Sequence, residues 1–149
     1  MTCSSLHAAV LPVHRAFGMV PRWRLLYLEG VAGGGGSPLR QGPWAHDRPS
    51  LVRHFAAIGG VVTSHAVVQL IGGLASVQRL EHPDAVAVMQ GVLAGLPEGT
   101  VVRACVPAHR PLAAWLQTNG FVVTDHDVFC SSPGVELPAS VSCVHPGLA

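Results

Sequence analysis

The spacing of apolar residues predicts three helices in the second part of the chain. In each, apolar residues recur three or four positions apart, so that one face of the helix is apolar. A proline or an aspartate stands near each start and a glycine follows each end, as is usual at helix boundaries. The predicted helices cover 47–58, 84–96 and 111–119.

Runs rich in valine, leucine and isoleucine lie between these helices and predict strands. Upstream of them, a short helix over 7–17 that ends at Gly18 precedes a strand over 23–28. After residue 46 the order of elements is α-β-β-α-β-α-β, which is typical of an α/β fold with a mixed sheet. The strands of this part are predicted over 61–71, 74–80, 100–106 and 121–130, with Gly72-Gly73 as a turn.

A run rich in glycine and proline interrupts the pattern over residues 30–46. Its four consecutive glycines and the Gly42-Pro43 break do not favour regular structure. A phosphate-binding loop would need a lysine at a fixed spacing, and the chain contains no lysine. We therefore interpret 30–46 as a flexible linker. It divides the chain into residues 1–29, a domain over 47–130 and a tail over 131–149 that we expect to wrap the surface.

The composition argues against several classes of protein. Charged residues make up 11% of the 149, against roughly 25% in soluble domains. The formal net charge of +1 gives no electrostatic footprint for nucleic acid or an anionic membrane. The apolar runs are shorter than a membrane-spanning helix, and the N-terminus lacks the positive start of a signal peptide. We expect a soluble, cytoplasmic protein that binds neither nucleic acid nor membrane.

Four cysteines are irregularly spaced, and none stands in a CxxC pair. This spacing favours free thiols over a disulfide framework. Cys105 and His109, together with Cys143 and His145, offer the thiolate and imidazole ligands that zinc prefers. Because their spacing matches no recognised zinc site, we predict no metal.

Two segments of the chain are alike. Residues 7–28 and 109–129 each contain a helix, a glycine, an apolar residue and then a strand. The second segment resembles the closing motif of the GNAT acetyltransferase superfamily, Asn-x-x-Ala-x-x-[Leu/Phe]-Tyr-x-x-x-Gly-Phe, through Gly120-Phe121. The order of elements before it agrees with that fold.

The resemblance implies a particular organisation of the chain. Residues 47–130 are similar to one reduced GNAT domain, and residues 1–29 are similar to the last helix and strand of a preceding one. The implied fold is a GNAT-like mixed sheet flanked by helices, incomplete relative to a full GNAT domain. The chain would then be the C-terminal part of a tandem GNAT arrangement with a degenerate second copy.

The same resemblance implies transfer of an acetyl group from acetyl-CoA to a small amine or peptide. Such a protein needs a splayed strand pair that admits the pantetheine of the cofactor. It also needs backbone N–H groups at a helix N-terminus that hold the pyrophosphate. By position, the resemblance places the cofactor at Arg79, Ala85 and Val86. His14, which stands where the family has its acid tyrosine, is the catalytic candidate.

Several residues depart from the family pattern. His82, Pro83 and Asp84 stand where small residues form the pyrophosphate loop, and Pro83 has no N–H to offer. Glu81 and Asp84 bring negative charge to the expected phosphate site. Leu116 takes the tyrosine position and carries no proton to donate. These departures argue against cofactor binding in the standard mode. They leave two hypotheses, an acetyltransferase or a non-catalytic module that packs against an intact GNAT domain or forms a homodimer.

Overall fold

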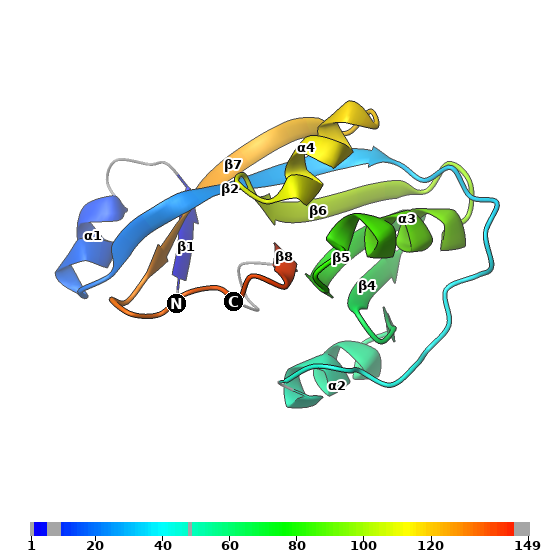
Figure 1. Ribbon diagram of the computed structural model, residues 1–149, viewed down its shortest axis with the longest axis horizontal. Helices are drawn as coiled ribbons and strands as arrows, with labels where there is room; N and C mark the ends of the chain where they lie inside the picture. Colours follow the sequence, from blue (N-terminus) through cyan, green and yellow to red (C-terminus); the bar gives the residue numbers. More distant parts are fainter. Residues whose placement is uncertain (1, 6–9, 48, 145–149) are drawn as a thin grey trace.

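The computed structural model describes residues 2–5, 10–47 and 49–144, which form an α/β structure (Figure 1). In these ranges the strands and helices come in the order β1 (Thr2–Ser5), α1 (Leu11–Ala16), β2 (Val20–Val31), α2 (Pro49–Ala57), β3 (Gly60–Val62), β4 (Ala66–Ile71), β5 (Leu74–Glu81), α3 (Ala85–Gly95), β6 (Val101–Pro107), α4 (Pro111–Thr118), β7 (Val122–Ser131) and β8 (Val141–Val144).

The described strands form one mixed sheet in the order β1-β7-β2-β6-β5-β4-β3, and β8 pairs with β5. β5 and β6 run parallel, whereas the other pairs are antiparallel. α3 connects β5 to β6, as a parallel pair requires a crossover of this kind. The predicted α/β class with a mixed sheet is confirmed.

β2 lies in the middle of this sheet, between β7 and β6. It is longer than the predicted 23–28, because neighbours on both sides satisfy its backbone groups along its length. The predicted boundary over 30–46 therefore does not separate two sheets, since the strand before it completes the sheet that follows it. That residues 1–29 derive from a preceding GNAT domain stays a prediction.

The glycine-rich segment after β2, residues 32–47, follows a defined path along α3 and down to α2 (Figure 1), and we call it the strap. Gly36 N–H donates to the carbonyl oxygen of Ala94 at 2.9 Å, and Leu39 N–H donates to that of Gly95 at 3.2 Å. A Cβ on Gly36 would lie 2.8 Å from the Cβ of Ala94. Close packing against α3 therefore explains why residue 36 is a glycine. The sequence predicted a flexible linker here, and this prediction is wrong because the segment is hydrogen-bonded to α3.

The predicted strand over 61–71 is two strands, β3 and β4, because a turn divides it. The hydroxyl oxygen of Thr63 accepts hydrogen bonds from the N–H groups of His65 and Ala66 at 3.3 and 2.9 Å. Such local bonds compete with strand pairing. The predicted turn at Gly72-Gly73 is confirmed, and both glycines adopt the positive φ that this residue tolerates.

The three helices predicted after the strap are confirmed as α2, α3 and α4, with boundaries that differ by a few residues. α3 begins after Asp84, whose carboxylate accepts from Ala87 N–H at 3.0 Å. α1 covers only part of the predicted 7–17, of which residues 7–9 lie outside the described residues. It ends before Gly18, which has a φ of 74°.

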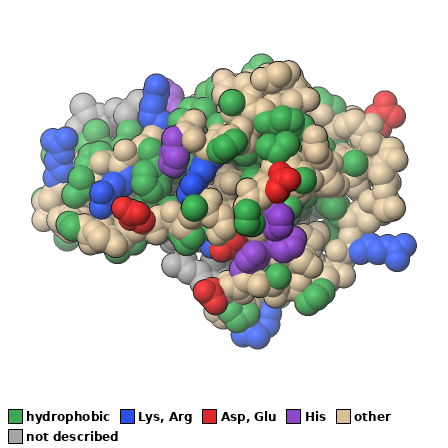
Figure 2. All heavy atoms as spheres, in the orientation of Figure 1, with side chains coloured by type: hydrophobic (Ala, Val, Ile, Leu, Met, Phe, Trp, Pro, Cys, Tyr) green, Lys and Arg blue, Asp and Glu red, His purple; other side chains and the backbone are tan. Residues whose placement is uncertain are grey.

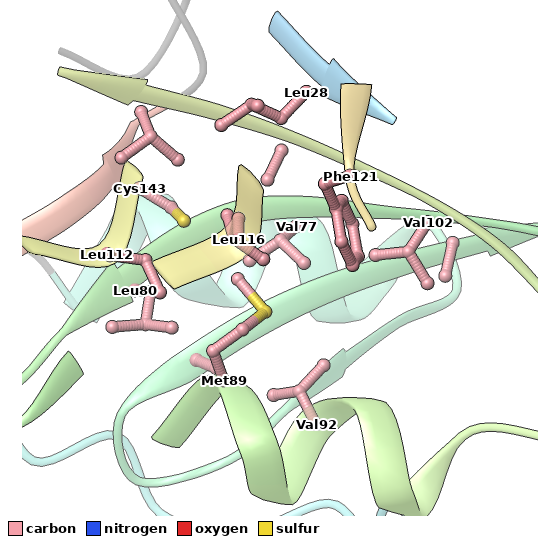
Figure 3. Packing of buried hydrophobic residues seen from close by; sticks show 14 of the residues in the cluster. Leu28, Val77, Leu80, Met89, Val92, Val102, Leu112, Leu116, Phe121 and Cys143 are labelled. Atoms are coloured by element: carbon pink, nitrogen blue, oxygen red, sulfur yellow. The ribbon is translucent and has the colours of Figure 1, made fainter. Parts of the chain in front are cut away.

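α3 and α4 cover one face of the sheet and enclose the main hydrophobic core (Figure 3). Met89 and Val92 of α3 and Leu116 of α4 pack against strand residues such as Val77 and Val102. The opposite face is covered at two places. The C-terminal tail packs over β7, β2 and β6, and α2 packs over β3 and β4.

The tail contains β8, which the sequence did not predict. Instead of only wrapping the surface, the tail inserts this strand into the sheet. Val141 and Val144 pack into the cluster under the tail. Cys143, on the other face of the strand, packs into the main core. β8 thus joins the two cores, and residues 145–149 of the predicted tail lie outside the described residues.

Candidate functional site

The parallel strands β5 and β6 diverge halfway along their length. Their pairing ends at Val77 and Ala104. Farther along β5, Leu80 pairs with Ala66 of β4 on one edge, so its other edge faces the gap left by β6. That edge pairs antiparallel with β8, where Leu80 lies opposite Cys143. A splayed strand pair is therefore present, as the GNAT resemblance implies, and the chain's own C-terminal strand fills it (Figure 1).

All four residues of β8 are buried. Full burial of a valine side chain stabilises the folded state by about 1.5–3 kcal/mol, so displacing Val141 and Val144 from this slot would be costly. Burial also raises the pKa of the Cys143 thiol far above its ordinary value. The thiol therefore stays protonated and is not a nucleophile at neutral pH.

Arg79, the first predicted cofactor ligand, is buried in β5. Its Nη2 and Nε lie 2.8 and 3.1 Å from Oε2 of Glu81, with which it forms a buried ion pair. The hydroxyl of Ser140, just before β8, donates to the other carboxylate oxygen of Glu81 at 3.4 Å. The guanidinium thus supports the junction of β5 and β8, where the resemblance expects it to meet a phosphate.

Ala85 and Val86, the other predicted cofactor ligands, lie in the first turn of α3 beside a cavity of about 270 Å³. Asp84 already caps this turn through its bond to Ala87 N–H. A phosphate would meet that carboxylate, because an anion occupies the positive end of the helix. Arg110 also lines the cavity, and its Nη2 donates to the carbonyl oxygen of Pro138 in the tail at 2.8 Å.

His14, the catalytic candidate, is not brought together with these residues. It is buried in α1, which lies at the opposite end of the molecule from α3 (Figure 1). Among the described residues, its Nε2 has no hydrogen-bond partner. Leu116, at the position of the family tyrosine, is fully buried in the main core. His14 therefore shares no site with Arg79, Ala85 and Val86.

A strip of the second sheet face lies uncovered between the tail and α2, a feature that the sequence analysis missed. Residues that lie in register across β2, β6, β5 and β4 point to the same face of the sheet. In this strip they point away from α3 and α4, because the residues next to them along each strand face the main core. We call this part of the sheet the open strip. It consists of one apolar row, Val31, Val101, Leu74 and Ile71, and one polar row, Glu29, Arg103, Ser76 and Gln69.

The open strip combines exposed apolar side chains with a charged pair. Val31 and Ile71 are 60% and 66% exposed. In the polar row, Arg103 Nε lies 2.7 Å from Oε2 of Glu29 on the neighbouring strand. A cavity of about 170 Å³ opens beside this pair, and Tyr27 forms part of its lining. Arg103, which stands between apolar residues of β6, is a local signal for this face, whereas the strand pairing that unites the rows is long-range.

Comparison with models of known protein families, with curated proteins and with solved structures gave no significant match. The described residues contain no helix with the length and apolar character needed to cross a membrane. In the same part of the chain, no cluster of three or more His, Cys, Asp or Glu side chains is arranged to hold a metal ion. His145, one of the four ligands considered for zinc, lies outside the described residues.

Proposed function

We propose that this chain is a non-catalytic module with a GNAT-like sheet, and that it forms a homodimer through the open strip. The position of β8 is the observation that supports the non-catalytic role. It takes the slot between β5 and β6 in which an acetyltransferase would hold the pantetheine of its cofactor. A buried strand of the same chain leaves no room there for an extended ligand.

The surroundings of the slot support a structural role in the same way. The guanidinium of Arg79 is matched by Glu81, and the first turn of α3 is capped by Asp84. Both features that would attract a pyrophosphate are satisfied within the chain. Acetyl transfer to an amine remains the alternative that the resemblance implies, and it would require β8 to leave the slot.

The open strip suits a second copy of the same chain because its polar row is self-complementary. A twofold axis that lies over the open strip, parallel to the sheet and along the strands between Glu29 and Arg103, would place each carboxylate against the guanidinium of the partner. The same operation would bring the exposed Val31 and Ile71 of each copy toward the partner. A standard interface buries about 800 Å² on each subunit, which is about a tenth of the 7520 Å² surface of this chain.

We expect the chain to sediment as a dimer and the variant Arg103→Glu to sediment as a monomer, because like charges would then meet across the axis. The double variant Glu29→Arg, Arg103→Glu reverses the pair and should restore the dimer. Analytical ultracentrifugation over a range of protein concentrations measures all three.

Arg24→Glu is the matched control, since Arg24 is an exposed arginine of the same strand β2 outside the open strip. It should leave the dimer unchanged. A monomeric wild-type chain at high micromolar concentration would overturn the proposed dimer, and so would a double variant that fails to recover it.

A further inference from the structure

Three histidines from distant parts of the chain meet at one surface, and we call them the histidine cluster. His46 lies on the strap, His65 on the turn between β3 and β4, and His82 just after β5. Nε2 of His46 lies 2.8 Å from Nδ1 of His65. The ring centroids of His65 and His82 are 4.5 Å apart. Figure 2 shows histidine side chains gathered on this face of the molecule.

The cluster lies where the end of the strap is attached to the sheet. Gly42 N–H donates to the carbonyl oxygen of Val62 at 2.8 Å, and Ala45 N–H donates to that of Ser64 at 3.1 Å. These bonds cover part of the outer edge of β3, which is the edge strand of the sheet. His46 follows Ala45 directly, so its contact with His65 closes this row of attachments.

The attached strap also shields an apolar cluster. Trp44 packs against Val52 of α2 and Val62 and Val67 of the sheet. The same tryptophan helps to line a cavity of about 220 Å³ between the strap and α2. Release of residues 41–47 would open this cavity and expose both the apolar cluster and the edge of β3.

The contact between His46 and His65 depends on whether their imidazole rings are protonated. A hydrogen bond between two imidazoles needs one N–H and one free lone pair, and two protonated rings have only donors. His82 keeps a partner in either state, because its Nδ1 lies 3.0 Å from the N–H and 3.2 Å from the carbonyl oxygen of Asp84. A protonated His82 therefore places a positive charge beside His65 and still keeps a hydrogen bond to the backbone of Asp84.

Two of the three carboxylates near the cluster are already engaged. The third belongs to Asp47, which follows His46 on the strap and whose backbone carbonyl accepts from Nε1 of Trp44 at 3.1 Å. The carboxylate of Glu81 is bound by Arg79, and that of Asp84 caps α3. α2 adds positive or titratable groups only, Arg53 and His54, within its described side chains.

Burial lowers the pKa of His65, and the neighbouring His82 and His46 lower it further. The folded state thus favours neutral His65, and its contribution to stability is complete above the ordinary pKa of 6.5. This contribution is lost as the pH falls from 6.5 through the lowered pKa of His65 in the folded state. Over this range protons bind His65 more readily in the form in which the strap is detached.

We propose that the histidine cluster is a proton-sensitive latch, which holds residues 41–47 against β3 at neutral pH and releases them in mildly acidic solution. The released strap exposes the outer edge of β3 and the apolar cluster beneath Trp44. The proposal does not depend on the dimer, because its residues lie outside the open strip.

Amide hydrogen exchange of the wild-type chain between about pH 7.5 and pH 5.5 tests the latch. After correction for intrinsic rates, the protection of Gly42 and Ala45 should fall several-fold, with an upper limit of about tenfold for the titration of one histidine. Gly36 and Leu39 lie on the same strap and bond to α3, away from any histidine of the cluster, so their protection should stay constant. Equal loss in both halves, or none in either, would overturn the proposal.

His65→Gln should remove the pH dependence, because glutamine keeps donor and acceptor atoms but does not titrate in this range. His54→Gln changes an exposed histidine of α2 outside the cluster and should leave the pH dependence intact. If the protection of Gly42 and Ala45 in the His65→Gln variant still follows pH as in the wild type, protonation of His65 does not release the strap and the proposal is wrong.

Discussion

Phe129→Ala is expected to lower the free energy of unfolding by about 3–5 kcal/mol. Phe129 is 0% exposed and stacks on Trp23, with ring centroids 4.6 Å apart. Its removal leaves a cavity between β7 and the C-terminal tail, in the cluster that contains Val141 and Val144 of β8. Small domains are stable by only about 5–15 kcal/mol in total. The substitution should therefore shift chemical denaturation strongly and loosen the docking of the tail.

Phe17→Ala is the matched control for this experiment. Phe17 follows α1 and is 77% exposed, so its loss should change the free energy of unfolding by about 0.5 kcal/mol or less. Similar denaturation midpoints for the two variants would contradict the packing of the tail on the second face of the sheet.

Glu81→Ala is expected to lower the free energy of unfolding by about 3 kcal/mol. It removes the carboxylate that lies 2.8 Å from Nη2 of Arg79 and leaves a buried guanidinium without that counter-charge. It also removes the acceptor of the Ser140 hydroxyl. The effect should appear as a lower denaturation midpoint and as faster hydrogen exchange at the β5 and β8 backbone.

Glu29→Ala provides the comparison, because it breaks the exposed pair with Arg103. Exposed ion pairs contribute about 0–1 kcal/mol, so this variant should keep nearly all of the stability within one subunit. Both variants are compared at a protein concentration where the chain is monomeric. If Glu81→Ala is as stable as Glu29→Ala, the buried ion pair between Arg79 and Glu81 does not stabilise the junction of β5 and β8.

The sequence predicted the local elements well because their signals are local. Asp84, Pro111 and Gly120 stand at or next to helix ends, and these residue types cap or stop helices by their own chemistry. Where a signal was local but overlooked, as with the hydroxyl of Thr63, a long apolar run concealed a turn.

The arrangement of the strands could not be read from the sequence in the same way. β8 has only four residues, and its burial depends on the divergence of β5 and β6, which no local pattern records. β2 belongs to the centre of the sheet, although a glycine-rich segment separates it from its neighbours in the chain. Both placements are set by long-range pairing.

The candidate site shows the same limit at the level of side chains. Arg79 matches a motif position, but its pairing with Glu81 two residues on is a property of the buried strand. His46, His65 and His82 have no common motif spacing, and they meet only because the strap passes over the turn between β3 and β4. His14 matches a motif position as well, yet it lies in a helix far from the others (Figure 1).

β8 occupies the gap between the diverging strands β5 and β6, in which we propose that an acetyltransferase would hold its cofactor. Isothermal titration calorimetry of the full chain with acetyl-CoA measures whether this gap is open to the cofactor. We predict only the heat of dilution up to millimolar ligand at neutral pH, because β8 and the Arg79–Glu81 pair fill the slot and its entrance. Saturable binding of acetyl-CoA with a stoichiometry near one per chain would show that the cofactor enters this gap and that β8 does not block it.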